Sequence, residues 1–177
     1  KEYYFFFTKH LVFTFLAVFL MITISALKTE LVVKLVLPLF IISFICLALV
    51  PIIGVEVKGA KRWIDLYFFR LQPIEILKPF FILMTAKILT LEKFKNSQIK
   101  YIFSFIILVS IIMLLIDQPD LGQSILLIGS WVATVFISGV SLFFIFIFFS
   151  IFLISISSLL FFLPEKFGYI INRLVTF

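Results

Sequence analysis

Long uninterrupted runs of apolar residues dominate this sequence, and short polar connections separate them. Each run approaches the length that a helix needs to cross a hydrocarbon core about 30 Å thick. Outer-membrane barrels show short alternating segments instead, so helices are the expected spanning element. With 64% hydrophobic and 14% charged residues, the chain has too little polar surface to cover a water-facing globule. The sequence therefore predicts an all-α polytopic membrane protein.

Six transmembrane helices are predicted, one for each apolar run. They cover residues 11–27, 31–53, 74–91, 101–116, 121–138 and 140–163. The fourth is short for a hydrocarbon core and is expected to extend by a turn at each end. Short connections force successive helices to run antiparallel. The loop at residues 54–72, the turn near Asp117 and the tail at residues 164–177 should therefore face the same side of the membrane as the N-terminus.

The charge pattern points to lipids and not to nucleic acid. The net charge is +6, but the fifteen Lys and Arg residues are scattered between apolar runs and form no dense basic block. Anionic head groups or an anionic lipid-linked substrate are better partners. The single cysteine, Cys46, lies in an apolar run and is interpreted as a buried inert thiol. His10, the single histidine, is interpreted as interfacial, and no metal-ligand cluster or nucleophile triad appears.

The connection after the second predicted helix is the main candidate for chemistry. Residues 54–79 read GVEVKGAKRWIDLYFFRLQPIEILKP. Ionisable groups at membrane depth are costly and usually face a cavity or a partner. Lys61, Arg62 and Arg70 are donors suited to phosphate oxygens, so a lipid pyrophosphate is the candidate ligand. The alternative is an interfacial amphipathic helix that grips lipid head groups without specificity.

Two further polar features have simple structural explanations. Glu75 and Lys78 are three residues apart on one helix face, so they can neutralise each other. Pro73 fits the first turn of that helix. Residues 117–122 (DQPDLG) form a polar turn between two apolar helices, in which Asp120 can cap the following helix.

Taken together, these motifs resemble those of the SEDS family, the FtsW/RodA/SpoVE-type peptidoglycan polymerases. The resemblance rests on residues 59–64 (GAKRWI), 72–78 (QPIEILK) and 118–122 (QPDLG), followed by Tyr169 and Arg173. Their order and spacing match those of the family over essentially the whole chain. The residues of these motifs are closer to those of the cell-division branch, FtsW, than to those of the elongation branch, RodA.

The sequence departs from the family pattern at two positions. Ile74 replaces a small residue, and Tyr67 stands where the family usually has glycine.

The resemblance implies a fragment of a fold with about ten spanning helices, in which the first helix precedes residue 1 and three more follow residue 177. Such proteins polymerise lipid II in the bacterial inner membrane, using an essential Asp in a large extracytoplasmic loop. That loop would begin at residues 164–177, so the catalytic Asp should lie beyond Phe177 and this fragment alone should not polymerise. The residues expected to bind or surround the substrate are Lys61, Arg62, Arg70, Glu75, Lys78 and Asp120.

The resemblance also implies partners and a topology. The expected partners are lipid II, a class B penicillin-binding protein transpeptidase, divisome proteins at the septum and membrane lipids. No cofactor is identified, and a divalent cation bound by the later loop stays open. The family topology places residues 54–72 outside the cytoplasm, although nine of the fifteen Lys and Arg residues fall on that side. A lipid II flippase, a RodA-like elongation polymerase and a non-catalytic scaffold remain alternatives.

Overall fold

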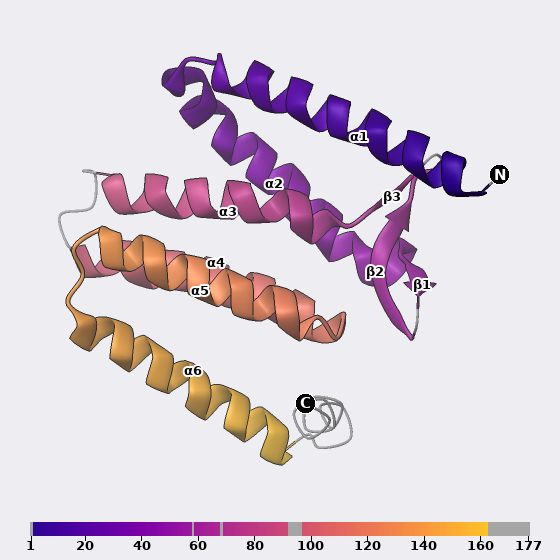
Figure 1. Ribbon diagram of the computed structural model, residues 1–177. Coiled ribbons are helices and arrows are strands. Elements are labelled where there is room, and N and C mark those ends of the chain that lie inside the picture. Colours follow the sequence, from indigo (N-terminus) through magenta and orange to yellow (C-terminus); the bar gives the residue numbers. More distant parts are fainter. Residues whose placement is uncertain (1, 58, 68, 92–96, 163–177) are drawn as a thin grey trace. The chain divides into compact units, whose positions relative to one another are not determined.

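The computed structural model describes residues 2–57, 59–67, 69–91 and 97–162, and it places six helices and three short strands in these ranges (Figure 1). The elements in chain order are α1 (Glu2–Ser25), α2 (Thr29–Ile53), β1 (Val55–Val57), β2 (Ala60–Asp65), β3 (Arg70–Leu71), α3 (Pro73–Thr90), α4 (Ser97–Asp117), α5 (Leu121–Ile137) and α6 (Leu142–Phe162). The predicted loop at residues 164–177, with Tyr169 and Arg173, lies outside the described residues, as does Lys58.

The helices match the six predicted spans, with shifts at their ends. Helix α4 begins one turn before the predicted run, as expected from the thickness of a hydrocarbon core, but extends it by only Asp117 at the other end. Helix α1 begins at Glu2, well before the predicted start at Leu11, because its aromatic and polar first residues continue the same helix. By length and apolar composition, three segments of the described chain could each cross a membrane: Phe6–Ser25, Thr29–Ile53 and Gln98–Asp117.

Hydroxyl side chains within the helices bond back to carbonyl oxygens one turn earlier. A bilayer offers no water to a hydroxyl group, so such a group must find its partner inside the protein. The bonds run from Thr8 to Tyr4, Thr14 to His10, Thr23 to Phe19, Ser110 to Ile106 and Ser150 to Phe146. This pattern suits helices surrounded by lipid.

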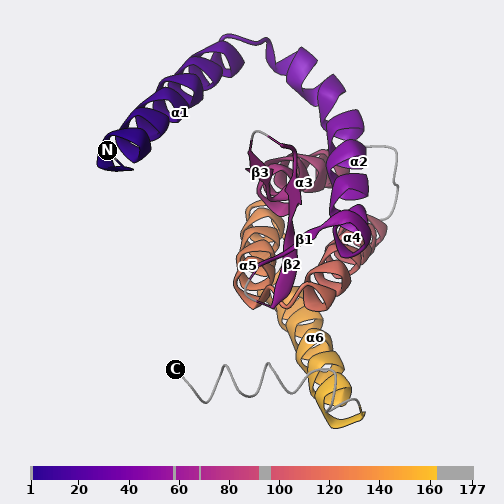
Figure 2. The ribbon, with the colours of Figure 1, turned by 90° about the vertical axis from the view of Figure 1, so that its right-hand side faces the viewer.

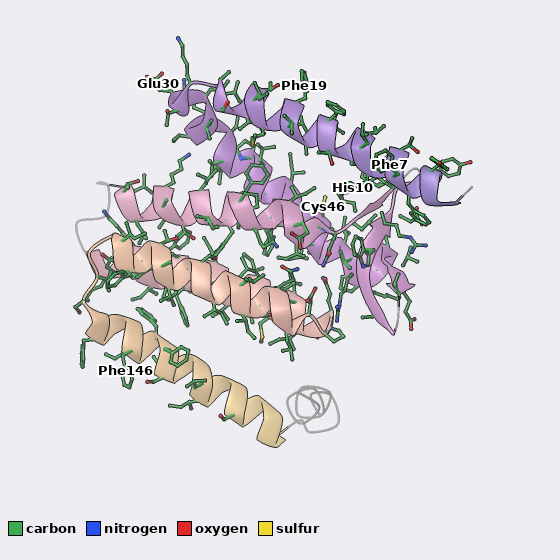
Figure 3. The ribbon with its side chains drawn as sticks, in the orientation of Figure 1. Phe7, His10, Phe19, Glu30, Cys46 and Phe146 are labelled. Carbon is green, nitrogen blue, oxygen red and sulfur yellow. The ribbon has the colours of Figure 1, made fainter. Side chains whose placement is uncertain are left out.

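The chain divides into two compact units, Lys1–Leu35 and Val36–Phe177. In the first unit, every α1 side chain that the structure describes is exposed, and His10 lies on this helix (Figure 3). In the second unit, α3, α4 and α5 pack against one another around a core that includes the fully buried Phe81, Leu115 and Leu127. Cys46 on α2 is half-buried, so the prediction of a buried thiol holds only in part (Figure 3).

Three aromatic rings join α4, α5 and α6 within the second unit. Trp131 lies between Phe105 and Phe148, with ring centroids 5.4 and 5.7 Å away, and its indole N–H donates to Ser104 Oγ at 3.1 Å. Lipid tails are as apolar as these side chains, so close packing and hydrogen bonds between helices hold such a bundle together. The Trp131 cluster supplies both.

Residues 55–71 form a small antiparallel sheet with strand order β1-β2-β3, and not the alternative amphipathic helix. Gly54 permits the sharp exit from α2, because a Cβ atom there would lie 2.3 Å from the carbonyl oxygen of Val50. Gly59, with a φ of 76°, supports the turn between β1 and β2. The sheet lies across the ends of α3, α4 and α5 (Figure 2). The all-α prediction therefore needs this correction within residues 54–72.

The turn between β2 and β3 contains Tyr67 in the left-handed region, with a φ of 66°. For a residue with a side chain this conformation costs about 1 kcal/mol. The amide of Tyr67 donates to Asp65 Oδ1 at 3.0 Å, and the amide of Leu66 donates to the carbonyl of Phe69 at 3.0 Å, which offset part of this cost. The conformation agrees with the glycine that the SEDS resemblance leads one to expect here.

Candidate functional site

Arg62 joins the sheet to the turn between α4 and α5. Its Nε donates to the carbonyl of Gln118 at 3.0 Å, and its Nη2 donates to the carbonyl of Pro119. The Asp120 carboxylate lies 3.9 Å from the same Nε. These contacts confirm that the loop after α2 and the turn near Asp117 lie at one end of the second unit (Figure 1). Because two of the forked donors are occupied by backbone oxygens, Arg62 holds the two segments together.

Asp120 is the N-cap residue of α5, but its side chain makes no capping bond. Its Oδ2 accepts from Gln72 Nε2 at 3.3 Å and faces Arg62. The capping role predicted for the Asp120 side chain is therefore wrong, since the carboxylate reaches across to the sheet and to the start of α3. The first turn of α5 is supported instead by Ser124, whose hydroxyl donates to the Asp120 carbonyl at 3.0 Å.

Two glutamines in this network were missed as site residues. Gln118 is only 3% exposed, and its Nε2 donates to the carbonyl of Leu47 at 3.2 Å, which ties the turn to α2. Gln72 bonds Asp120 from the residue before α3. Each glutamine precedes a proline in the sequence, and this shared Gln-Pro pattern was the signal that could have identified them.

A cleft of about 300 Å³ opens between the sheet, the end of α2 and the α4–α5 turn. Its lining includes the ionisable residues Glu56, Lys61 and Asp117, and the buried Gln118. The predicted ligand-binding residue Lys61 is exposed at this cleft, next to Arg62 in β2. The cleft is therefore polar, and its charges are of both signs.

The remaining predicted site residues lie outside the Arg62–Asp120 network. Arg70 Nε is 3.6 Å from Asp65 Oδ2, and both side chains are strongly exposed, at 55% and 43%. Such a surface pair contributes little to stability. Its position at the sheet surface leaves the predicted role of Arg70 in binding phosphate untested.

Glu75 and Lys78 form the ion pair that their spacing suggested, with Oε2 and Nζ 2.6 Å apart. Pro73 occupies the first turn of α3, as predicted. Sequence reasoning missed a third member of this group. Gln123 of α5 donates from Nε2 to Glu75 Oε1 at 2.8 Å, so the carboxylate is bound from two helices.

The described residues contain no preformed metal site. Among these residues, no group of three His, Cys, Asp or Glu side chains is arranged to hold an ion.

The apolar helices, the interhelical hydrogen bonds and the polar site at one end of the bundle define a polytopic membrane protein. Residues 1–177 match the sequence model of the FtsW, RodA and SpoVE family, described as cell cycle proteins, and the chain belongs to this family.

Curated relatives carry the names of both branches. The chain is 30% identical over 179 residues to a probable peptidoglycan glycosyltransferase FtsW of Wigglesworthia glossinidia brevipalpis, covering 100% of this chain and 46% of that protein. It is 38% identical over 107 residues to the peptidoglycan glycosyltransferase MrdB of Escherichia coli K12, covering 58% and 28%. The chain thus spans less than half the length of these relatives.

Solved structures share the fold. The crystal structure of Thermus thermophilus RodA, a rod shape determining protein, matches with a TM-score of 0.62 at 29% identity, over 70% of this chain and 41% of RodA. A chain from a peptidoglycan synthase complex matches with a TM-score of 0.76 at 24% identity, over 94% of this chain and 50% of that one. These matches agree with the predicted polytopic fold.

Proposed function

We propose that this chain is part of a peptidoglycan glycosyltransferase that polymerises lipid II during septal cell-wall synthesis. The family match over all 177 residues carries the proposal. Relatives named peptidoglycan glycosyltransferases support it. Because the chain covers less than half of those relatives, the activity is proposed for the whole parent protein and not for this segment alone.

Within that activity, the described residues have two roles. Arg62 and Asp120 position the sheet on the α4–α5 turn, since their polar atoms are already engaged with each other or with nearby groups. Lys61 presents its ammonium group at the cleft, where it can help to stabilise the pyrophosphate that leaves lipid II. Glu56 and Asp117 line the same cleft, and their negative charges would repel a pyrophosphate. Further positive charges, beyond that of Lys61, would therefore be needed to complete an anion site. A divalent cation is one such group.

The proposed setting is the bacterial inner membrane at the division septum. The proposed partners are a class B penicillin-binding protein and other divisome proteins. The fold likeness to a chain of a peptidoglycan synthase complex is compatible with such a partner.

The proposed topology has residues 54–72 outside the cytoplasm. The relevant test is impermeant thiol labelling of intact cells that carry the parent protein without Cys46 and with a single cysteine at Glu56 or Lys95. We expect labelling at Glu56 and protection at Lys95. Labelling of Lys95 alone would reverse the topology.

The activity is tested with the purified parent protein, lipid II and a class B transpeptidase. We expect glycan strands on a gel, and more of them with a division-type than with an elongation-type partner. Preference for the elongation-type partner would move the assignment to the RodA branch, which the MrdB relative favours. If a folded, partner-bound protein forms no strands, the polymerase proposal fails. Movement of lipid II across vesicles would then support a flippase.

A further inference from the structure

Gln123 connects α5 to the ion pair on α3. The Glu75 carboxylate uses its two oxygens separately: Oε2 lies 2.6 Å from Lys78 Nζ, and Oε1 accepts from Gln123 Nε2 at 2.8 Å. Lys78 lies on the same helix as Glu75, so their ion pair alone cannot orient α3 against its neighbour. The bond from Gln123 supplies that connection.

The Glu75–Lys78 ion pair is partly exposed, so it does not by itself fix the positions of the two side chains. The Glu75 side chain is 49% exposed and that of Lys78 is 23% exposed. Pairs spaced three residues apart on an exposed helix face are weak, and their long side chains readily take other rotamers. A fixed amide donor from α5 restricts the carboxylate to one position. Through it, Lys78 is also restricted.

The other end of the Gln123 amide carries a cost in stability. Its Oε1 is buried and has no hydrogen-bond partner among the described residues. Reversing the amide would place this oxygen against Glu75 Oε1, where two acceptors would meet. The Glu75 carboxylate, paired with Lys78, therefore dictates the orientation that leaves Gln123 Oε1 unsatisfied. A buried carbonyl without a donor destabilises a fold. An apolar side chain of the same length would avoid this penalty.

We propose that Gln123 is a positioning residue for the Glu75–Lys78 pair in the polymerisation reaction. This inference rests on the proposed function. Gln123 holds the carboxylate from α5, so that Lys78 presents its ammonium group in one direction. Loss of such a contact leaves the chemical groups in place and reduces the fraction of time they spend in productive geometry.

The test compares Gln123→Met, Glu75→Gln and the double variant in the parent protein with its partner. Methionine keeps the length of glutamine and removes both polar atoms. We expect Gln123→Met to lower kcat about tenfold to a hundredfold, as for a lost positioning contact, while the unfolding temperature stays the same or rises. In the Glu75→Gln background, adding Gln123→Met should produce no further loss. Gln98→Met, the same change at the far end of α4, is the control and should retain the wild-type rate.

Either of two activity results would overturn the inference: a wild-type rate for Gln123→Met, or activity losses that simply add in the double variant. A fall in unfolding temperature that parallels the activity loss would indicate a purely structural role and would also overturn it.

A second readout does not depend on activity. The Lys78 ammonium lies 2.6 Å from Glu75 Oε2, so an ordered carboxylate shields it from a reagent. Releasing Glu75 should therefore raise the rate at which an amine-specific reagent acylates Lys78, as measured by peptide mass spectrometry. An unchanged acylation rate would contradict the positioning role. If the wild type forms no glycan strands but Lys78 becomes more reactive in Gln123→Met, the proposed function fails while the contact is supported.

Discussion

Replacing Arg62 with alanine should abolish glycan-strand formation by the parent protein and destabilise it by about 2–3 kcal/mol. The substitution removes the donors to the carbonyls of Gln118 and Pro119. It also leaves the Asp120 carboxylate, which is only 12% exposed, with the bond from Gln72 Nε2 at 3.3 Å but without its cationic neighbour. A buried charge that loses its cationic neighbour costs more than the pair contributed. The measurements are polymerisation of lipid II and unfolding in detergent micelles.

Two variants serve as controls for Arg62→Ala. Arg62→Lys keeps the positive charge but cannot make the forked contacts, so its stability should fall between wild type and Arg62→Ala. Arg70→Ala removes an exposed arginine from the same sheet, and its pair with Asp65 should contribute less than about 1 kcal/mol. Equal stability of Arg62→Ala and Arg70→Ala would contradict the role assigned to Arg62.

Trp131→Ala should destabilise the bundle by about 3–5 kcal/mol. The indole is 2% exposed, contacts Phe105 and Phe148, and donates to Ser104. Lipid cannot fill the resulting cavity between α4, α5 and α6, so the packing contacts are lost outright. The unfolding free energy of the parent protein in micelles or bicelles measures this effect.

Trp131→Phe separates packing from hydrogen bonding. Phenylalanine keeps an aromatic ring near Phe105 and Phe148 but has no N–H for Ser104. The expected loss is about 1 kcal/mol, the size of one hydrogen bond between membrane helices. If the phenylalanine and alanine variants were equally destabilised, the hydrogen bond would matter more than the packing of the rings.

Local sequence patterns predicted the helices well but missed the sheet. Apolar runs such as residues 101–116 identify a helix because spanning a membrane requires a minimum apolar length. Residues 55–65 form a short segment of mixed polarity with several charges, so their sequence predicts a loop, with an amphipathic helix as the alternative. The alternation around Gly59 was compatible with a hairpin. The strands are defined by pairing between segments, Val57 with Ala60 and Asp65 with Arg70, which a local pattern does not specify.

The sequence motifs predicted candidate site residues but not the bonds between them. The motifs predicted four of the candidate residues discussed above: Arg62, Glu75, Lys78 and Asp120. Local spacing correctly predicted the ion pair between Glu75 and Lys78. Local spacing also predicted that the Asp120 side chain caps its own helix, whereas its carboxylate accepts a hydrogen bond from Gln72. An N-cap bond and a longer-range bond compete for the same oxygens, and sequence spacing shows only the first.

By itself, the sequence determined that the chain forms membrane helices, that the longest polar connection lies between the second and third of them, and that its motifs belong to one family. These are properties of composition, periodicity and order along the chain. Only the tertiary structure decided which groups meet: Arg62 with Gln118, Gln118 with Leu47, and Gln123 with Glu75. Each of these bonds joins different elements of the fold. The packing of the helices sets the distances of these bonds, and a local sequence pattern does not predict that packing.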